Sequence, residues 1–297
     1  MLGNAQSGVT ELPSAQRKPW WLYPNLLSLD APLVAIAWLH VFGEAWQLGY
    51  HPWHAYLCLG LVVWSIYIFD RLLDVSMMSS TPEKLEPRHR FHARHRKLLI
   101  ALMSAAMLGS VFVLVTEMPF SIFRYLLMGA ILVAGFFGLS MLASENREDV
   151  GLSKNLVAGV AFAYGTAMTA FVYRAELGVI NLLLSREFIC FGVLCMINIS
   201  AIDFWEHAER SKDEEIKARD ELTVMLPLVS LALAAILFAL QRSHMRPFYY
   251  AILTGVALMY LLNRRRCDFS MDGLRVLADV VLLAPVLVFH AVNETDF

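Results

Sequence analysis

The chain has 297 residues, of which 58% are hydrophobic and 17% charged, with a mean hydropathy of +0.55 and a formal net charge of −2. A soluble domain cannot bury so much apolar surface, so this composition excludes that class and predicts a membrane protein, with the lipid bilayer and no nucleic acid as partner. The four scattered cysteines form neither a CxxC pair nor a zinc spacing, and we expect them to be core residues.

Nine apolar segments are long enough to cross a bilayer. In chain order they are residues 27–49, 53–74, 97–116, 119–143, 154–174, 180–205, 222–241, 246–263 and 273–293. The pattern predicts an all-α, polytopic membrane protein whose nine transmembrane helices form a single bundle around a lipid-accessible cavity. Residues 1–26 are predicted to be a polar cytoplasmic tail, and residues 27–297 the transmembrane domain.

The distribution of basic residues predicts the orientation. With nine spans, the N-terminus and the loops after even-numbered helices share one side of the membrane, and that side carries nineteen of the 24 Lys and Arg residues. The other side carries Arg124, Arg174, Arg186, Arg242 and Arg246. The positive-inside rule therefore predicts an integral protein of a bacterial-type inner or plasma membrane, with a cytoplasmic N-terminus.

The second apolar segment ends with Asp70 and Asp74, which are four residues apart and so share one helical face. A carboxylate costs roughly 2.5–3.5 kcal/mol at the middle of a membrane helix, and two like charges also repel each other. A divalent cation would remove the repulsion, and hard oxygen ligands favour Mg²⁺. Alternatively, the pair lies just outside the hydrocarbon, solvated, with Arg71 as its counter-ion.

A second acidic cluster lies at the end of the sixth segment. Asp203, Glu206, His207 and Arg210 fall on one helical stripe, and Asn198 precedes them. Both clusters lie at the cytoplasmic ends of even-numbered helices, where they can face each other across a bundle. Together they suit a ligand with an anionic head and a long apolar tail, bridged by Mg²⁺. The alternative is an ordinary interfacial helix end, where acidic and basic residues mix freely.

Two further acids lie within apolar segments. Asp279 is expected to face the bundle interior, because exposure to lipid would be too costly. It either contacts an acceptor substrate or pairs with Arg275 one turn away, and we expect the pair. Asp30 is expected to matter much less for turnover than Asp70 or Asp74.

These features resemble the UbiA superfamily of intramembrane prenyltransferases, nine-helix proteins with aspartate-rich motifs on helices two and six. The first family motif is N-D-x-x-D-x-x-x-D. Asp70 and Asp74 match its last two acids, whereas Ile66 and Tyr67 replace the Asn and the first Asp.

The second family motif, N-x-x-x-x-D-x-x-D, is matched by Asn198, Asp203 and Glu206, the last as a conservative replacement. The further acid of the family is displaced here to Glu209, one residue early. A third family feature is a lysine that opens helix five and is followed by small residues, and Lys154 matches it.

The resemblance implies a Mg²⁺-dependent transfer of a prenyl group from a prenyl diphosphate to a lipophilic, aromatic acceptor, at an active site on the cytoplasmic side. The implied catalytic and metal-binding residues are Asp70, Asp74, Asp203 and Glu206, with Asn198 as a further metal ligand. The diphosphate is expected to contact Lys154, Arg71 and Asn198.

Two alternatives stay open. The first is a terpene cyclase of the same superfamily, in which the prenyl cation is captured within its own chain. The second is a non-catalytic member that has lost metal binding and serves as a lipid-binding or assembly subunit, since Ile66 and Tyr67 leave the first motif incomplete.

Overall fold

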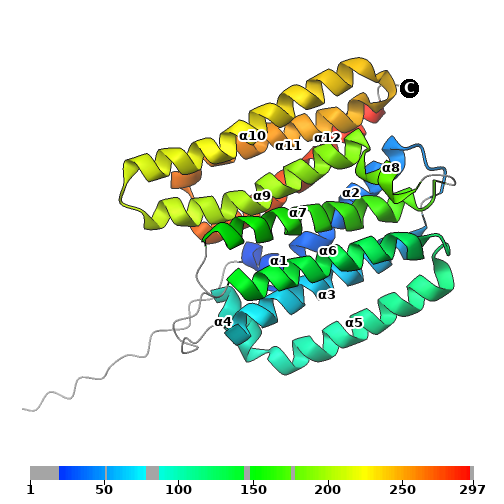
Figure 1. The fold of residues 1–297 in the computed structure, drawn as a ribbon, viewed down its shortest axis with the longest axis horizontal. Coiled ribbons are helices and arrows are strands. Elements are labelled where there is room, and N and C mark those ends of the chain that lie inside the picture. The colour runs from blue at the N-terminus through cyan, green and yellow to red at the C-terminus, as the bar shows by residue number, and fades with distance from the viewer. Residues whose placement is uncertain (1–19, 51, 78–86, 144–147, 175–177, 295–297) are drawn as a thin grey trace, which may run out of the picture.

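All regular structure is helical in the residues that the computed structural model describes, which are 20–50, 52–77, 87–143, 148–174 and 178–294 (Figure 1). The long helices are α2 (Asp30–Ala45), α3 (Trp53–Met77), α5 (Arg96–Glu117), α6 (Ile122–Ala143), α7 (Glu148–Phe171), α9 (Arg186–Arg210), α10 (Glu214–Gln241), α11 (Arg246–Arg264) and α12 (Met271–Asn293). The short ones are η1 (Trp20–Leu22), α1 (Tyr23–Leu26), α4 (Pro87–Arg94), α8 (Val179–Leu183), η3 (Ser243–Met245) and η4 (Arg266–Asp268). The expected all-α class is confirmed for these ranges.

The lengths and hydropathies of the described helices indicate an integral membrane protein. Seven of these helices are long and apolar enough to cross a membrane, namely α3, α5, α6, α9, α10, α11 with its η3 turn, and α12. An eighth span results if residues 20–26 and α2, which meet at 80°, count as one. We expected nine spans; a long helix lies in each of the nine segments, but α7 is not among the candidate spans.

The long helices run side by side, with α7 in the middle (Figure 1). Helix α7 packs against α2, α3, α6 and α9. Beyond α9 lie α10, α11 and α12. Helix α11 packs on both α10 and α12, while α5 packs on α3 at the opposite edge of the molecule. In the most apolar stretch of α5 and of α6, only 11% of the residues are buried inside the protein, against 61% in α9. Helices α5 and α6 therefore present apolar side chains outward, as lipid contact requires.

Four buried aromatic rings join α2 to α9 and α11. Trp38 stacks on Phe191 with ring centroids 4.4 Å apart, and Phe42 and Phe248 complete the group at centroid distances of 5.4–5.9 Å. The Trp38 indole Nε1 donates a 2.7 Å hydrogen bond to the carbonyl of Leu282 on α12. Satisfying this buried donor fixes α12 against α2.

Helices α7 and α9 approach each other closely at Gly159. A Cβ atom at this position would lie 2.7 Å from the backbone N and Cα atoms of Met196, so the contact requires glycine. The helices are antiparallel, and Asn155, one turn before Gly159, therefore lies beside Asp203, two turns after Met196.

Two segments outside the predicted spans also form helices. Residues 1–19 of the predicted tail lie outside the described residues, whereas residues 20–26 form η1 and α1. Helix α4 occupies part of the loop expected between the second and third spans. It packs against α3 and α1 and lies near the C-terminal end of α3, the end that carries the first acidic cluster (Figure 1).

Candidate functional site

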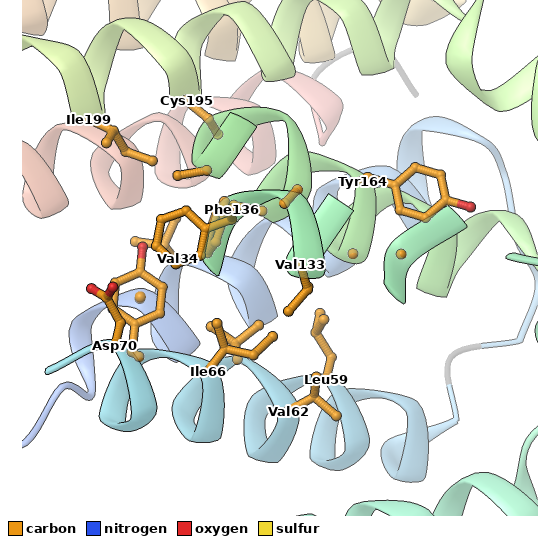
Figure 2. Close-up of a pocket in the computed structure, with 18 of the residues that line it drawn as sticks. Val34, Leu59, Val62, Ile66, Asp70, Val133, Phe136, Tyr164, Cys195 and Ile199 are labelled. Atoms are coloured by element: carbon orange, nitrogen blue, oxygen red, sulfur yellow. The ribbon is translucent and has the colours of Figure 1, made fainter. Parts of the chain in front are cut away.

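A cavity of about 810 Å³ lies between α2, α3, α5, α6, α7, α9 and α12. Its walls are mainly apolar, and Leu59, Val62 and Ile66 of α3 face Val133 of α6 across it (Figure 2). The charged residues that line it come from the C-terminal halves of α3 and α9 and the N-terminal halves of α2, α7 and α12. These halves meet at one end of the cavity, which therefore has an apolar body and a charged end.

The first acidic cluster faces this cavity. Asp70, Arg71 and Asp74 all line it, as their positions on one side of α3 require. Lys154 Nζ lies 3.8 Å from Asp70 Oδ1, and the two side chains are 22% and 19% exposed. The sequence interpretation had Lys154 opening its helix, but α7 begins at Glu148, so the unpaired N–H groups of the helix N-terminus are not adjacent to Lys154.

Asp203 lines the same cavity from α9. Asn155 Nδ2 donates a 2.5 Å hydrogen bond to Asp203 Oδ2. Helix α7 thus presents a cation to Asp70 and, one residue later, an amide to Asp203. The expectation that Asp70 and Asp203 face one cavity is confirmed. Asn155 was not singled out from the sequence, although it directly follows Lys154.

Glu206 also lines the cavity, but its carboxylate is held by two arginines. Arg275 of α12 binds Glu206 Oε1 through Nη2, and Arg210 Nη2 lies 3.2 Å from Glu206 Oε2. Arg275 Nη1 also donates to Asp272 Oδ1 at 3.3 Å. The Arg275 side chain is only 6% exposed, so this network fixes α12 against α9 and gives both terminal nitrogens of a buried guanidinium group a carboxylate partner.

Asn198 occupies a structural position at the cavity wall. Its Nδ2 donates a 2.8 Å hydrogen bond to the Ala278 carbonyl, and the residue is 3% exposed. This bond ties the middle of α9 to α12. The metal-binding and diphosphate-binding roles expected for Asn198 stay predictions.

Asp279 does not make the expected pair with Arg275. Its carboxyl group lies beside that of Asp30, while Arg275 binds Glu206 and Asp272. Asp30 and Asp279 both line the cavity, and the smaller effect on turnover expected for Asp30 stays a prediction. The proximity of Asp30 and Asp279 could not be predicted from the sequence, because helical periodicity relates residues within one helix and not residues of α2 and α12.

The fit of the site to Mg²⁺ can be judged from its oxygen ligands. Among the described residues, no three His, Cys, Asp or Glu side chains lie close enough together to hold a metal ion. Magnesium in phosphate-binding sites is usually held by one or two carboxylates together with substrate phosphates and water. Asp70, Asp74 and Asp203 fit that arrangement, because their carboxylates line the space where a diphosphate would bind. Glu206 does not fit, because guanidinium groups already bind both of its oxygens.

The chain matches no protein-family model, curated protein or solved structure. The resemblance to the UbiA superfamily therefore rests on the motif residues and the predicted topology.

Proposed function

We propose that this protein is a Mg²⁺-dependent intramembrane prenyltransferase that transfers the prenyl group of a prenyl diphosphate to an apolar, aromatic acceptor. The observation that carries the proposal is the division of one cavity into an apolar body and a charged end. A prenyl diphosphate has the same division, since a hydrocarbon chain ends in a multiply charged anion. Its chain would lie along the apolar walls, and its diphosphate would lie beside Asp70, Lys154 and Asp203.

The charged residues would act on the leaving diphosphate. Mg²⁺ held by Asp70, Asp74 and Asp203 would neutralise the negative charge that develops on it. Lys154 and Arg71 would contact phosphate oxygens directly, Lys154 as a point charge. Each of these side chains already lines the cavity, so little rearrangement is needed to assemble the site.

The walls near the charged end would protect the allylic cation left behind. Phe136 and Phe162 line the cavity, and Lys154 Nζ lies 5.3 Å from the centroid of the Phe136 ring. A cation at this place is therefore within reach of the same ring face. The apolar lining also excludes water, which would otherwise capture the cation.

We further propose that α7 is a ninth span, with the N-terminus in the cytoplasm. Helix α7 packs against four other long helices, so it needs less lipid-facing apolar surface than α5 or α6. Reporter tags test this topology, because nine spans put the two chain ends on opposite sides of the membrane. Tags on the same side would contradict it.

The activity is tested by measuring diphosphate release in nanodiscs from geranyl, farnesyl and geranylgeranyl diphosphates, with and without Mg²⁺ and an aromatic acceptor. Asp70→Asn and Asp74→Asn should each abolish turnover, because each removes charge from a metal-binding carboxylate. Asp268→Asn, an exposed residue that does not line the cavity, serves as the control.

The outcomes separate the alternatives. Release that requires the acceptor supports a transferase, and release without any acceptor identifies a cyclase. No release from any donor, or near-normal turnover of Asp74→Asn at limiting Mg²⁺, would overturn the proposal.

A further inference from the structure

We propose that three arginines at one end of α9, α10 and α11 bind the headgroup of an anionic phospholipid. Arg186 opens α9, Arg242 directly follows α10 and Arg246 opens α11, and we call these three residues the arginine site. The site lies where α8 meets α9, at the end of α9 opposite to Glu206 (Figure 1). None of its arginines lines the cavity, so the inference does not depend on the proposed prenyltransferase activity.

Two of the three guanidinium groups are held in place by uncharged partners. Arg186 Nη1 donates a 2.7 Å hydrogen bond to Gln241 Oε1, and its guanidinium group lies 4.8 Å from the centroid of the Phe238 ring. Arg246 Nε donates to the carbonyl of Ala239 at 3.4 Å. An amide, an aromatic ring and a carbonyl orient these groups but do not neutralise their charges.

The third arginine shares a buried carboxylate with a tyrosine. The Glu187 side chain is only 4% exposed and accepts a 3.0 Å hydrogen bond from the Tyr249 hydroxyl. Arg242 Nη1 lies 3.9 Å from Glu187 Oε1, and the Arg242 side chain is 46% exposed. No other carboxylate of the described residues forms an ion pair with the arginine site. Three positive charges therefore face one negative charge, and the site favours an anion.

The length of α9 places the site at the level of lipid headgroups. Arg186 and Glu206 are twenty residues apart on this helix, which is a candidate span. The helical rise separates them by about 30 Å, the thickness of the hydrocarbon core of a bilayer. With Glu206 at the charged end of the cavity, Arg186 would lie among the phosphates of the opposite leaflet.

An apolar surface adjoins the arginine site on the side of the bilayer core. Leu237, one turn before Gln241 on α10, is 56% exposed, and Leu233, a further turn away, is 59% exposed. Ile189, one turn after Arg186 on α9, is 45% exposed. These residues share helix faces with the two partners of the Arg186–Gln241 contact. A lipid whose phosphate binds Arg186 could therefore lay an acyl chain along them.

The chemistry of the site favours a phospholipid with a net negative charge. A planar guanidinium group can bind two oxygens of one phosphate through parallel, charge-assisted hydrogen bonds. The contacts with Gln241 and Phe238 already orient Arg186, so less conformational freedom is lost on binding. A phosphatidylcholine headgroup would bring a trimethylammonium group towards the arginines, which would repel it. Phosphatidylglycerol has no such cation, and we therefore assign the site to a lipid of this class.

The test measures lipid binding to the full chain in detergent by native mass spectrometry, with phosphatidylglycerol and phosphatidylcholine of the same acyl chains. The wild type should bind its tightest phosphatidylglycerol at least tenfold more tightly than phosphatidylcholine, equivalent to about 1.4 kcal/mol. Arg186→Gln and Arg242→Gln should each reduce this preference. Arg124→Gln makes the same change at an exposed arginine of α6, outside the site, and should keep it. Glycerol 3-phosphate, which lacks acyl chains, should not displace the lipid.

The outcomes decide between this site and general electrostatics. Equal affinities of the wild type for the two lipids, or a preference unchanged in both Arg186→Gln and Arg242→Gln, would overturn the inference. Equal losses in Arg124→Gln and Arg186→Gln would overturn it as well, and so would displacement of the lipid by glycerol 3-phosphate. Should Arg242→Gln fail to fold for want of the Glu187 contact, Arg186→Gln still decides. Diphosphate release does not enter the test, so a failure of the proposed function would leave the lipid site unaffected.

Discussion

The substitution Gly159→Ala tests whether the close contact of α7 and α9 builds the charged end of the cavity. The new methyl group would lie 2.7 Å from the N, Cα and Cγ atoms of Met196, and two of these are backbone atoms that cannot rotate away. Carbon atoms prefer separations of about 3.5–4.0 Å, so the two helices would have to move apart by roughly 1 Å. The Asn155–Asp203 hydrogen bond, now 2.5 Å long, would then pass its normal limit.

The expected free-energy change has two parts. Overpacking a tight contact costs about 1–3 kcal/mol. Replacing a helical glycine by alanine returns about 0.5–1 kcal/mol, so a net loss of stability is expected. Gly165→Ala provides the matched control on the same helix, because a Cβ atom there meets nothing within 4 Å. That variant should gain only the stability that alanine adds to a helix relative to glycine, with no overpacking cost.

Thermal unfolding in detergent measures both changes, and diphosphate release measures the effect on the site. Gly159→Ala should lower the unfolding midpoint and turnover, whereas Gly165→Ala should raise the midpoint. Equal midpoints for the two variants would refute the reasoning, because they would mean that α7 and α9 tolerate a side chain at the contact.

Two further substitutions test the charged side chains. Lys154→Ala should weaken binding or ionisation of the prenyl diphosphate at least tenfold, or by about 1.4 kcal/mol. The control Lys97→Ala, which removes an exposed cation of α5, should do little. Equal effects of the two substitutions on the KM for the donor would mean that Lys154 acts only through general electrostatics. Glu206→Gln should leave the Mg²⁺ dependence of turnover unchanged but cost about 1.5–3 kcal/mol of stability, the contribution of a hydrogen bond to a charged group. A shifted Mg²⁺ dependence at unchanged unfolding midpoint would instead make Glu206 a metal ligand.

Those features that depend on local periodicity could be predicted from the sequence. Apolar segments long enough to span a membrane marked the positions of the long helices, and Asp70 and Asp203 were expected on one cavity because both end even-numbered segments. Helix α7 was expected as a span and is helical, yet it is not among the candidate spans. The apolar segment predicted here, residues 154–174, begins with Lys154 and Asn155 and contains small residues such as Gly159. Such residues suit a helix surrounded by other helices and a cavity, where little apolar surface meets lipid.

Pairings between distant helices could not be predicted in this way. Arg275 was expected to bind Asp279 because the two lie one turn apart, but each found a partner on another helix. Glu206 was expected to bind a metal because of its motif position, but its carboxylate is the counter-ion of the buried Arg275 guanidinium group. A buried cation without a carboxylate partner would be strongly destabilising. Local spacing shows which side chains share a face, and only the packing of α2, α9 and α12 decides which of them meet.

The distances between the charged groups around the cavity, and their exposure to it, indicate which of them a ligand could engage. Glu206 is bound from two sides by Arg275 and Arg210, so a metal ion would have to displace two cations to reach it. Lys154 and Asp70 are 3.8 Å apart, beyond hydrogen-bond distance, and both are partly exposed to the cavity. A metal ion at Asp70 and a phosphate oxygen at Lys154 would form two charge-assisted contacts where the two side chains now face each other at 3.8 Å. The Glu206–Arg275 pair would keep α12 against α9 while Lys154 and Asp70 engage the substrate.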